Sequence, residues 1–181
     1  DIIEVEPKSL RHEGYAGKIE REVYRGPLIA MVLLYIPETD EILLNQQFRM
    51  APFIHGDSQP FLFECAAGAV DDGETPEEAA RRECLEETGC VVDDLIFIGN
   101  YYTSAGCFDE KYYTYIGRAD RAVAGHYGEA HEGEEIKTHL LPASKVFEML
   151  DTNQITNGMS AMALHWFARH RDGLRKKWLP E

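Results

Sequence analysis

The chain has 181 residues, which is enough for one domain with at most a small appended subdomain. Its 32 acidic and 18 basic residues give a formal net charge of −14, which argues against binding nucleic acid through phosphate contacts. No apolar run reaches the roughly 20 residues of a membrane span, and no segment resembles a secretory leader. We therefore expect a cytoplasmic protein with neither a nucleic-acid nor a membrane partner.

The N-terminal part of the chain predicts strands. Residues 1–26 alternate apolar and charged side chains and predict a short strand or two in a peripheral sheet. Residues 28–36 are continuously apolar, as in a fully buried strand, and residues 41–48 predict the second strand of a hairpin. On this basis we divide the chain into an N-terminal β subdomain, residues 1–40, and a main domain, residues 41–181.

The middle of the chain interleaves strands with loops and one helix. Pro, Gly, Asp and Ser break any periodicity at residues 51–60 and predict a loop. The other expected elements are strands at 61–67, 95–102 and 111–118 and a loop at 103–110. This irregular order favours a mixed sheet between helices over a regular alternation of strand and helix.

The C-terminal third begins with a long polar stretch at residues 119–134. Its length indicates a functional or disordered segment. A strand at 135–141, a helix at 143–150 and a last helix from near Asn157 or Ser160 are expected to follow. In the last helix Met159, Met162, Ala163 and Trp166 have the spacing of a core-facing stripe, and the basic tail at 171–177 is expected to fray.

The four cysteines, at positions 65, 84, 90 and 107, contain no C-x-x-C pair. Buried free thiols in a reducing cytosol are the expected state, and a zinc site is the alternative.

A helix at residues 76–88 has the clearest end signals. Thr75 suits the N-cap and Pro76 the first helical position. Glu78 follows the cap by three residues, as in a capping box, and Gly89 suits the C-terminal stop. Both ends of this helix are therefore specified locally.

Three carboxylates lie on one flank of this helix. Glu83 and Glu87 are about 40° apart around the axis, and Glu86 lies about 60° to the other side of Glu83. Crowded carboxylates repel one another, and Mg²⁺ prefers such oxygens while keeping waters for a phosphate substrate. Ala79 and Ala80 are expected to share the flank and to leave room for a ligand. A solvated acidic helix face is the alternative.

Residues 68–90 have the spacing Gly-x5-Glu-x7-Arg-Glu-U-x-Glu-Glu-x-Gly-U, in which U is apolar. We call this pattern the box. Its positions are Gly68, Glu74, Arg82, Glu83, Cys84, Glu86, Glu87, Gly89 and Cys90. The stretch resembles the signature of the Nudix hydrolases, with cysteine where Ile, Leu or Val is usual. Because cysteine behaves as a small hydrophobe, we expect looser packing and intact chemistry. The resemblance implies the α/β/α sandwich of that family, in which helices enclose a mixed central sheet, here with a small N-terminal antiparallel sheet.

Four further features resemble the branch of bacterial ADP-ribose pyrophosphatases and GDP-mannose hydrolases. They are Gln46-Gln47-Phe48-Arg49 with Ala51-Pro52, Phe63-Glu64 before Ala66-Ala67-Gly68, Ser104-Ala105-Gly106 with Glu110, and the acidic loop at 131–136. Ala105 and Cys107 stand where this branch has Pro and Gly, which changes the loop near the distal sugar.

The resemblance implies a role for each matching residue. The divalent cation, magnesium or else manganese, would be held by Ala67, through its carbonyl, and by Glu83, Glu87 and Glu134. The catalytic residues would be Glu132 as base, Glu86 and Arg82, with Glu129, Glu134 and Glu135 open as alternative bases. The substrate would be contacted by Arg21, Arg49, Ser104 and Glu110. A surface ion pair is the alternative for either arginine.

The expected function is metal-dependent pyrophosphohydrolysis of a nucleoside diphosphate sugar, with ADP-ribose preferred over GDP-mannose or another nucleotide sugar. A non-catalytic nucleotide-binding regulatory domain is a further alternative, which the presence of Glu83, Glu86 and Glu87 disfavours. The resemblance also implies a homodimer in which the N-terminal sheet reaches the site of the partner, so that Arg21 acts in trans.

Overall fold

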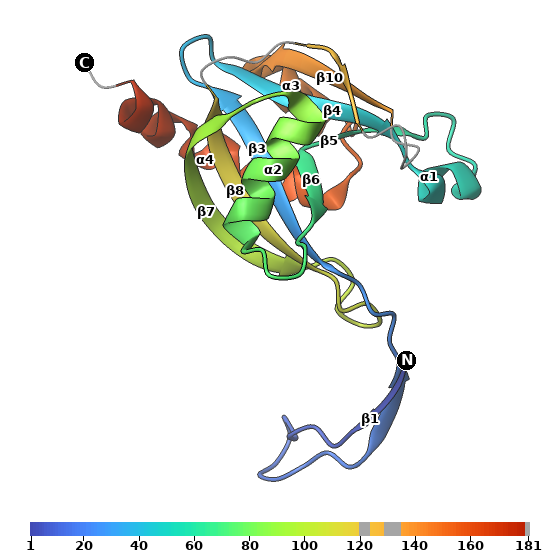
Figure 1. Ribbon diagram of the computed structural model, residues 1–181. Coiled ribbons are helices and arrows are strands. Elements are labelled where there is room, and N and C mark those ends of the chain that lie inside the picture. The colour runs from blue at the N-terminus through green and yellow to red at the C-terminus, as the bar shows by residue number, and fades with distance from the viewer. Residues whose placement is uncertain (120–123, 129–134, 180–181) are drawn as a thin grey trace.

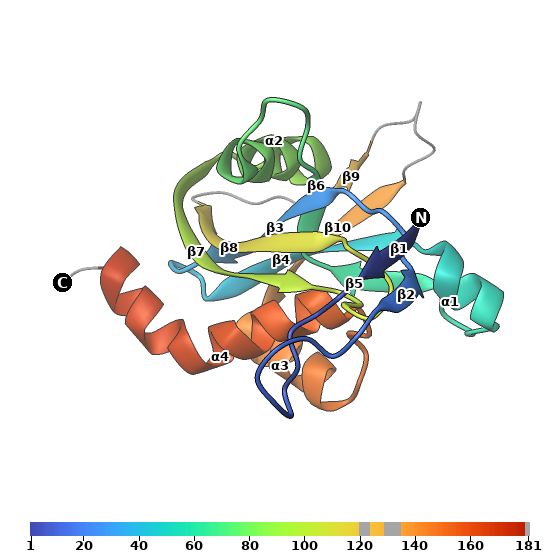
Figure 2. The ribbon, with the colours of Figure 1, turned by 90° about the horizontal axis from the view of Figure 1, so that it is seen from below.

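A computed structural model describes residues 1–119, 124–128 and 135–179. The main body is an α/β/α sandwich in which α2 (Pro76–Thr88) covers one face of a mixed sheet (Figure 1). The other face is covered by α3 (Ala143–Asp151) and α4 (Gly158–Trp178), as Figure 2 shows from below. Two apolar cores fill the spaces between these layers, so the predicted fold class is confirmed.

The N-terminal residues form a separate two-stranded antiparallel sheet of β1 (Ile2–Val5) and β2 (Ile19–Glu22). This sheet extends away from the main body (Figure 1), as expected for a peripheral sheet. The following strand, β3 (Leu28–Ile36), lies in the middle of the main sheet although it precedes the division expected at residue 40. The division of the chain into two units stays a prediction.

Among the described residues the main sheet has eight strands, ordered β7-β8-β3-β4-β10-β9, with β5 paired to β4 and β6 paired to β3. Their bounds are β4 (Glu41–Phe48), β5 (Phe61–Glu64), β6 (Ala66–Ala69), β7 (Val92–Tyr102), β8 (Lys111–Ala119), β9 (His126–Tyr127) and β10 (Ile136–Pro142). Strands β3 and β8 are parallel, and the other pairs are antiparallel. The remaining expected strands are therefore confirmed with small shifts of their ends.

The segment expected as one strand at 61–67 is two strands, because β3 and β4 diverge. These two strands pair with each other only near their hairpin, from Leu34 to Ile36 on β3. Beyond that point β4 pairs with β5 and β3 pairs with β6, so the chain crosses from one strand to the other at Cys65. The crossing brings β6 under α2, which places the start of the box beside the acidic helix.

The loop expected at 51–60 is wrong in its first half, which is the short helix α1 (Met50–His55). Pro52 is accommodated because it lies in the first turn, where backbone N–H groups have no partner within the helix. Gly56 ends the helix in the left-handed region at φ 85°.

Helix α2 has the predicted bounds and caps. Thr75 and Glu78 form the reciprocal bonds of a capping box, and Gly89 is left-handed at φ 66°. The expectation for Ala79 and Ala80 is wrong: both are fully buried in the core beneath α2 and leave no room for a ligand there.

Cys65, Cys84 and Cys90 are buried and form no disulfide, as expected, while Cys107 also forms none but is exposed. Burial raises the pKa of the Cys65 thiol to about 12 and that of the Cys84 thiol well above its usual value.

The predicted stripe of α4 is displaced by one residue. The buried positions are Ser160, Ala163, Leu164, Phe167, Leu174 and Trp178, and of the predicted stripe only Ala163 is fully buried. The small Ser160 and Ala163 let the helix approach the sheet closely, and Ser160 Oγ accepts the Cys65 N–H at 2.9 Å.

The expectation of a frayed basic tail is also wrong. Arg171 and Arg175 form ion pairs with Asp40, and Lys177 pairs with Asp94 at 2.7 Å. Trp178 is buried and donates its indole N–H to the same Asp94 carboxylate. In the described part of the chain no helix is long and apolar enough to cross a membrane.

Candidate active site

The Glu83 carboxylate lies directly against Gly68. A Cβ atom at position 68 would lie 2.0 Å from Glu83 Oε1, so only glycine leaves space for this side chain. Gly68 is in the extended strand β6 and does not have a positive φ. The requirement for glycine therefore comes from the contact between strand and helix rather than from backbone strain.

The Glu87 carboxylate, one turn further along α2, is only 6% exposed. Its Oε2 accepts a bond of 3.0 Å from the Ala67 N–H and one of 2.8 Å from Asn45 Nδ2. Ala67 and Gly68 are adjacent in β6, so the two carboxylates meet the same short strand. The structure thus brings together Ala67, Glu83 and Glu87, the described members of the expected metal site.

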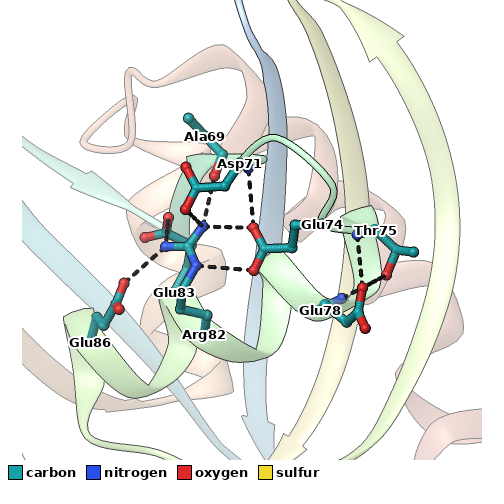
Figure 3. Close-up of polar contacts among 8 residues, drawn as sticks. All are labelled: Ala69, Asp71, Glu74, Thr75, Glu78, Arg82, Glu83 and Glu86. Atoms are coloured by element: carbon teal, nitrogen blue, oxygen red, sulfur yellow. Dashed lines mark hydrogen bonds and ion pairs between the residues drawn. The ribbon is translucent and has the colours of Figure 1, made fainter.

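Arg82 links the remaining acidic side chains of the box, as Figure 3 shows. Its guanidinium donates to both oxygens of Glu74, to Glu83 at 2.7 Å and to Glu86 at 2.9 Å. A further bond of 2.8 Å reaches the Ala69 carbonyl oxygen in β6. Hydrogen bonds from Arg82 and the Asp71 N–H hold the pKa of Glu74 below its usual value. Arg82 therefore holds Glu74, Glu83 and Glu86 in position, while the catalytic role expected for Arg82 stays a prediction.

The charge at this flank suits a divalent cation. Arg82 is shared by Glu74, Glu83 and Glu86, and Glu87 adds a fourth carboxylate. Within the described residues no three His, Cys, Asp or Glu side chains form a complete metal-binding group. Mg²⁺ does not require one, because it is commonly held by one or two carboxylates, several waters and the phosphates of a substrate. Glu83 and Glu87 fit that donor set.

Arg49 is anchored at the end of β4 by a buried partner. Its Nε and Nη2 donate to Glu64 Oε2 at 2.9 and 2.7 Å, and the Glu64 side chain is 5% exposed. Burial alone would lower the pKa of Arg49, but the bonds to Glu64 and the charges of Glu64 and Glu87 raise it. Asn157 donates to Glu64 at 2.9 Å and also caps α4, so this ion pair is tied to the C-terminal helix. The Arg49 side chain remains 42% exposed, which leaves part of the guanidinium accessible.

The other expected substrate residues lie away from α2. Ser104 and Glu110 belong to the loop between β7 and β8, where Glu110 accepts a bond of 3.1 Å from Thr103 Oγ1. Tyr24, which leads out of the N-terminal sheet, bonds to the same loop. Arg21 is exposed in β2 and donates to the adjacent Glu20 carbonyl. Glu132 and Glu134 lie outside the described residues.

Sequence reasoning missed the contributions of Asn45, Glu64 and Asn157. Asn45 lies among buried apolar residues of β4, and Glu64 is the last residue of β5, where it follows three apolar residues. A buried polar side chain must find a partner, so their position in apolar strands was the available signal.

Comparison with known proteins agrees with this geometry. A family model of the NUDIX domain matches residues 26–160. The chain belongs to the NUDIX family.

Relatives in the NUDIX family are similar over most of their length. An ADP-ribose pyrophosphatase of Escherichia coli is 30% identical over 173 residues, covering 93% of this chain and 82% of that protein. A protein of the same description from Haemophilus influenzae is 32% identical over 91% of this chain and 77% of its own. A GDP-mannose pyrophosphatase of Cronobacter sakazakii is 34% identical over 85% and 80%, respectively.

One solved structure, described as an ADP compounds hydrolase, superimposes with a TM-score of 0.69. It covers 96% of this chain and 93% of its own, at 17% sequence identity. This similarity confirms the fold.

Proposed function

We propose that this NUDIX protein is a divalent-metal-dependent pyrophosphohydrolase of a nucleoside diphosphate sugar. The preferred substrate is ADP-ribose, and the products are AMP and ribose 5-phosphate. The observation that carries the proposal is the packing of α2 against β6. There Gly68 makes space for the Glu83 carboxylate, and the Ala67 N–H donates to the Glu87 carboxylate. Relatives named ADP-ribose pyrophosphatase support the substrate class.

The cation in this proposal is Mg²⁺ or Mn²⁺, held by Glu83, Glu87 and the Ala67 carbonyl, with Glu134 as a further ligand. When bound, it supplies charge neutralisation at the diphosphate and a more acidic water. Arg82 keeps Glu83 and Glu86 in position through bonds of 2.7 and 2.9 Å.

The base in this proposal is a glutamate of the late acidic loop, which accepts the proton of the attacking water. Glu132 is the preferred candidate, and Glu129, Glu134 and Glu135 remain alternatives. The water oxygen forms a bond to one phosphorus, and the bridging P–O bond breaks to release the two monophosphates.

Substrate binding is assigned to Arg49, Ser104, Glu110 and Arg21. Arg49 is the best supported, since the buried Glu64 fixes its position and part of its guanidinium stays accessible. Arg21 would act from the partner subunit of a homodimer. The exposed apolar side chains of the N-terminal sheet support that arrangement. The buried free thiols support a location in the reducing cytoplasm.

GDP-mannose is the second candidate substrate, because GDP-mannose pyrophosphatases are 31–34% identical to this chain, although over 85–88% of it rather than the 91–93% that the ADP-ribose enzymes match. Ala105 and Cys107 alter the loop after β7 in a way that bears on sugar choice.

The test is a panel of nucleotide sugars, including ADP-ribose and GDP-mannose, with purified protein and Mg²⁺. We expect the highest kcat/KM with ADP-ribose. Glu87→Gln should lower kcat on the order of a thousandfold, because it removes a metal-binding charge. The matched control is Glu77→Gln on the same helix, whose side chain pairs with Arg81 at the surface and should not affect turnover. No cleavage of any nucleotide sugar, or near-normal turnover by Glu87→Gln, would contradict the proposal.

A further inference from the structure

Asn45 is a buried polar residue in the apolar part of β4. It follows Ile42, Leu43 and Leu44, which are all buried, and it is itself only 3% exposed. Its Nδ2 donates to Glu87 Oε2 at 2.8 Å, the oxygen that also accepts the Ala67 N–H. Asn45 thus reaches from the centre of the sheet to a carboxylate of the proposed cation site.

The orientation of the Asn45 amide follows from its partner. Nδ2 of Asn45 is the donor to the Glu87 carboxylate, which leaves the amide oxygen Oδ1 to accept a hydrogen bond from another group. Oδ1 of Asn45 is buried and has no hydrogen-bond partner among residues 1–119, 124–128 and 135–179. Buried acceptors in folded proteins are nearly always satisfied by the protein or by an ordered water.

A water bound to a divalent cation is a donor of the required kind. Its oxygen is engaged by the metal, so its hydrogens need acceptors, and Mg²⁺ keeps several such waters. Groups outside the direct ligands commonly fix the ligating side chains and tune the affinity of the site. Beside Glu87, Asn45 offers its amide Nδ2 as a donor to the carboxylate and its Oδ1 as an acceptor for a metal-bound water.

We propose that Asn45 is a positioning residue of the cation site. Its Nδ2 fixes the Glu87 carboxylate, and its Oδ1 accepts a hydrogen bond from a water of the cation's hydration shell. The inference rests on the proposed function, since it assumes a cation at Glu83 and Glu87. It differs from a purely structural role because it predicts an effect on cation affinity in the absence of substrate.

The test is a titration of the full chain with Mn²⁺ in the absence of nucleotide. The concentration of free Mn²⁺ is measured at each step by electron paramagnetic resonance. Asn45→Leu, which has similar size but neither donor nor acceptor, should raise the Kd for Mn²⁺ by about tenfold to a hundredfold. The matched control is Gln46→Leu. Gln46 is adjacent in β4, but its side chain bonds to His139 at 3.0 Å, so this variant should keep the wild-type Kd.

A second variant keeps the test informative if the leucine variant does not fold. Asn45→Ala removes both groups of the amide without introducing a larger apolar side chain. It should also raise the Kd for Mn²⁺ by about tenfold to a hundredfold. Circular dichroism of each variant verifies folding.

Wild-type Mn²⁺ affinity in a folded Asn45→Leu or Asn45→Ala variant would overturn the inference. Absence of the cation site on which the proposed function depends would look different, because wild type and Gln46→Leu would then bind no Mn²⁺ either. Failure of the proposed hydrolysis alone would show in the nucleotide-sugar panel and not in this titration.

Discussion

Gly68 shows at the scale of one residue how the box works. Its strand conformation admits any side chain, and the neighbouring positions 66, 67 and 69 are all alanine. The three atoms nearest to a Cβ at this position all belong to the Glu83 carboxylate, and the closest would lie 2.0 Å away. A methyl group here must therefore displace the carboxylate while leaving the sheet intact.

We expect Gly68→Ala to lower kcat on the order of a hundredfold, because a displacement of about 1 Å at a reacting centre has an effect of that size. The melting temperature should change by only a few degrees. Gly158→Ala is the control, since a Cβ there meets nothing within 4 Å at the start of α4 and should leave kcat unchanged. The kcat is measured with ADP-ribose at saturating Mg²⁺, and the melting temperature is measured by circular dichroism. Wild-type kcat in Gly68→Ala would show that Glu83 does not need its present position.

The sequence predicts the grouping of site residues only where their relation is local. Arg82 and Glu86 have the i,i+4 spacing of helical neighbours, and the structure pairs them at 2.9 Å. The bond from Asn45 to Glu87 joins positions 42 residues apart, and that from Asn157 to Glu64 spans 93. Such contacts depend on how β3 and β4 diverge, which no local pattern specifies.

At the scale of elements, the ends of α2 are set by local contacts, whereas the packing of α4 is set by contacts that are distant in the sequence. Capping residues at both ends of α2 act within a few positions, so its bounds could be read from the sequence. In α4 two overlapping stripes satisfy helical periodicity, and the choice between them is made by close packing of Ser160 and Ala163 on the sheet. The last turns were expected to fray because their partners, Asp40 and Asp94, lie far away in the sequence.

Asp40 is the main anchor of the end of α4. Arg171 Nε and Tyr35 Oη each donate to its Oδ1 at 2.8 Å, and Arg175 lies 3.1 Å from the same oxygen. Burial would raise the pKa of Asp40, but the bonds from Arg171 and Tyr35 and the charges of both arginines outweigh it and lower the pKa. A carboxylate with a lowered pKa stabilises the fold fully above its unfolded pKa of about 3.9 and loses this effect as the pH falls through its folded pKa.

We therefore expect Asp40→Asn to lower the free energy of unfolding by about 1–3 kcal/mol near pH 7. The difference from wild type should stay constant down to about pH 5 and shrink below about pH 4. Urea unfolding at a series of pH values measures it. Asp172→Asn is the control, because the Asp172 side chain is 91% exposed. The free energy of unfolding of this variant should match that of wild type within about 0.5 kcal/mol. An equal difference at pH 3 and pH 7 would show that the ionised form of Asp40 is not what stabilises α4.

At the scale of the whole molecule, the N-terminal sheet stands apart from the two-core sandwich (Figure 1). An isolated pair of strands is marginally stable in water. Here Ile2 and Tyr15 are 70% and 59% exposed, and Leu10 is also exposed. Exposed apolar side chains that lie together in this way are typical of a surface that contacts another protein. The homodimer implied by the sequence resemblance stays a prediction, and it provides such a surface.

If Arg21 acts in trans, two inactive variants should complement each other. Arg21→Ala retains Glu87, and Glu87→Gln retains Arg21, so a mixed dimer would contain one site with both residues intact. Random mixing makes half of the dimers mixed, so we expect about a quarter of the wild-type rate after the variants are unfolded and refolded together. Refolding each variant alone provides the baseline, and size-exclusion chromatography confirms the dimer. Arg11→Ala, altered at an exposed position between β1 and β2, should be as active alone as wild type. A mixture no more active than its separate components would place Arg21 outside the partner's site.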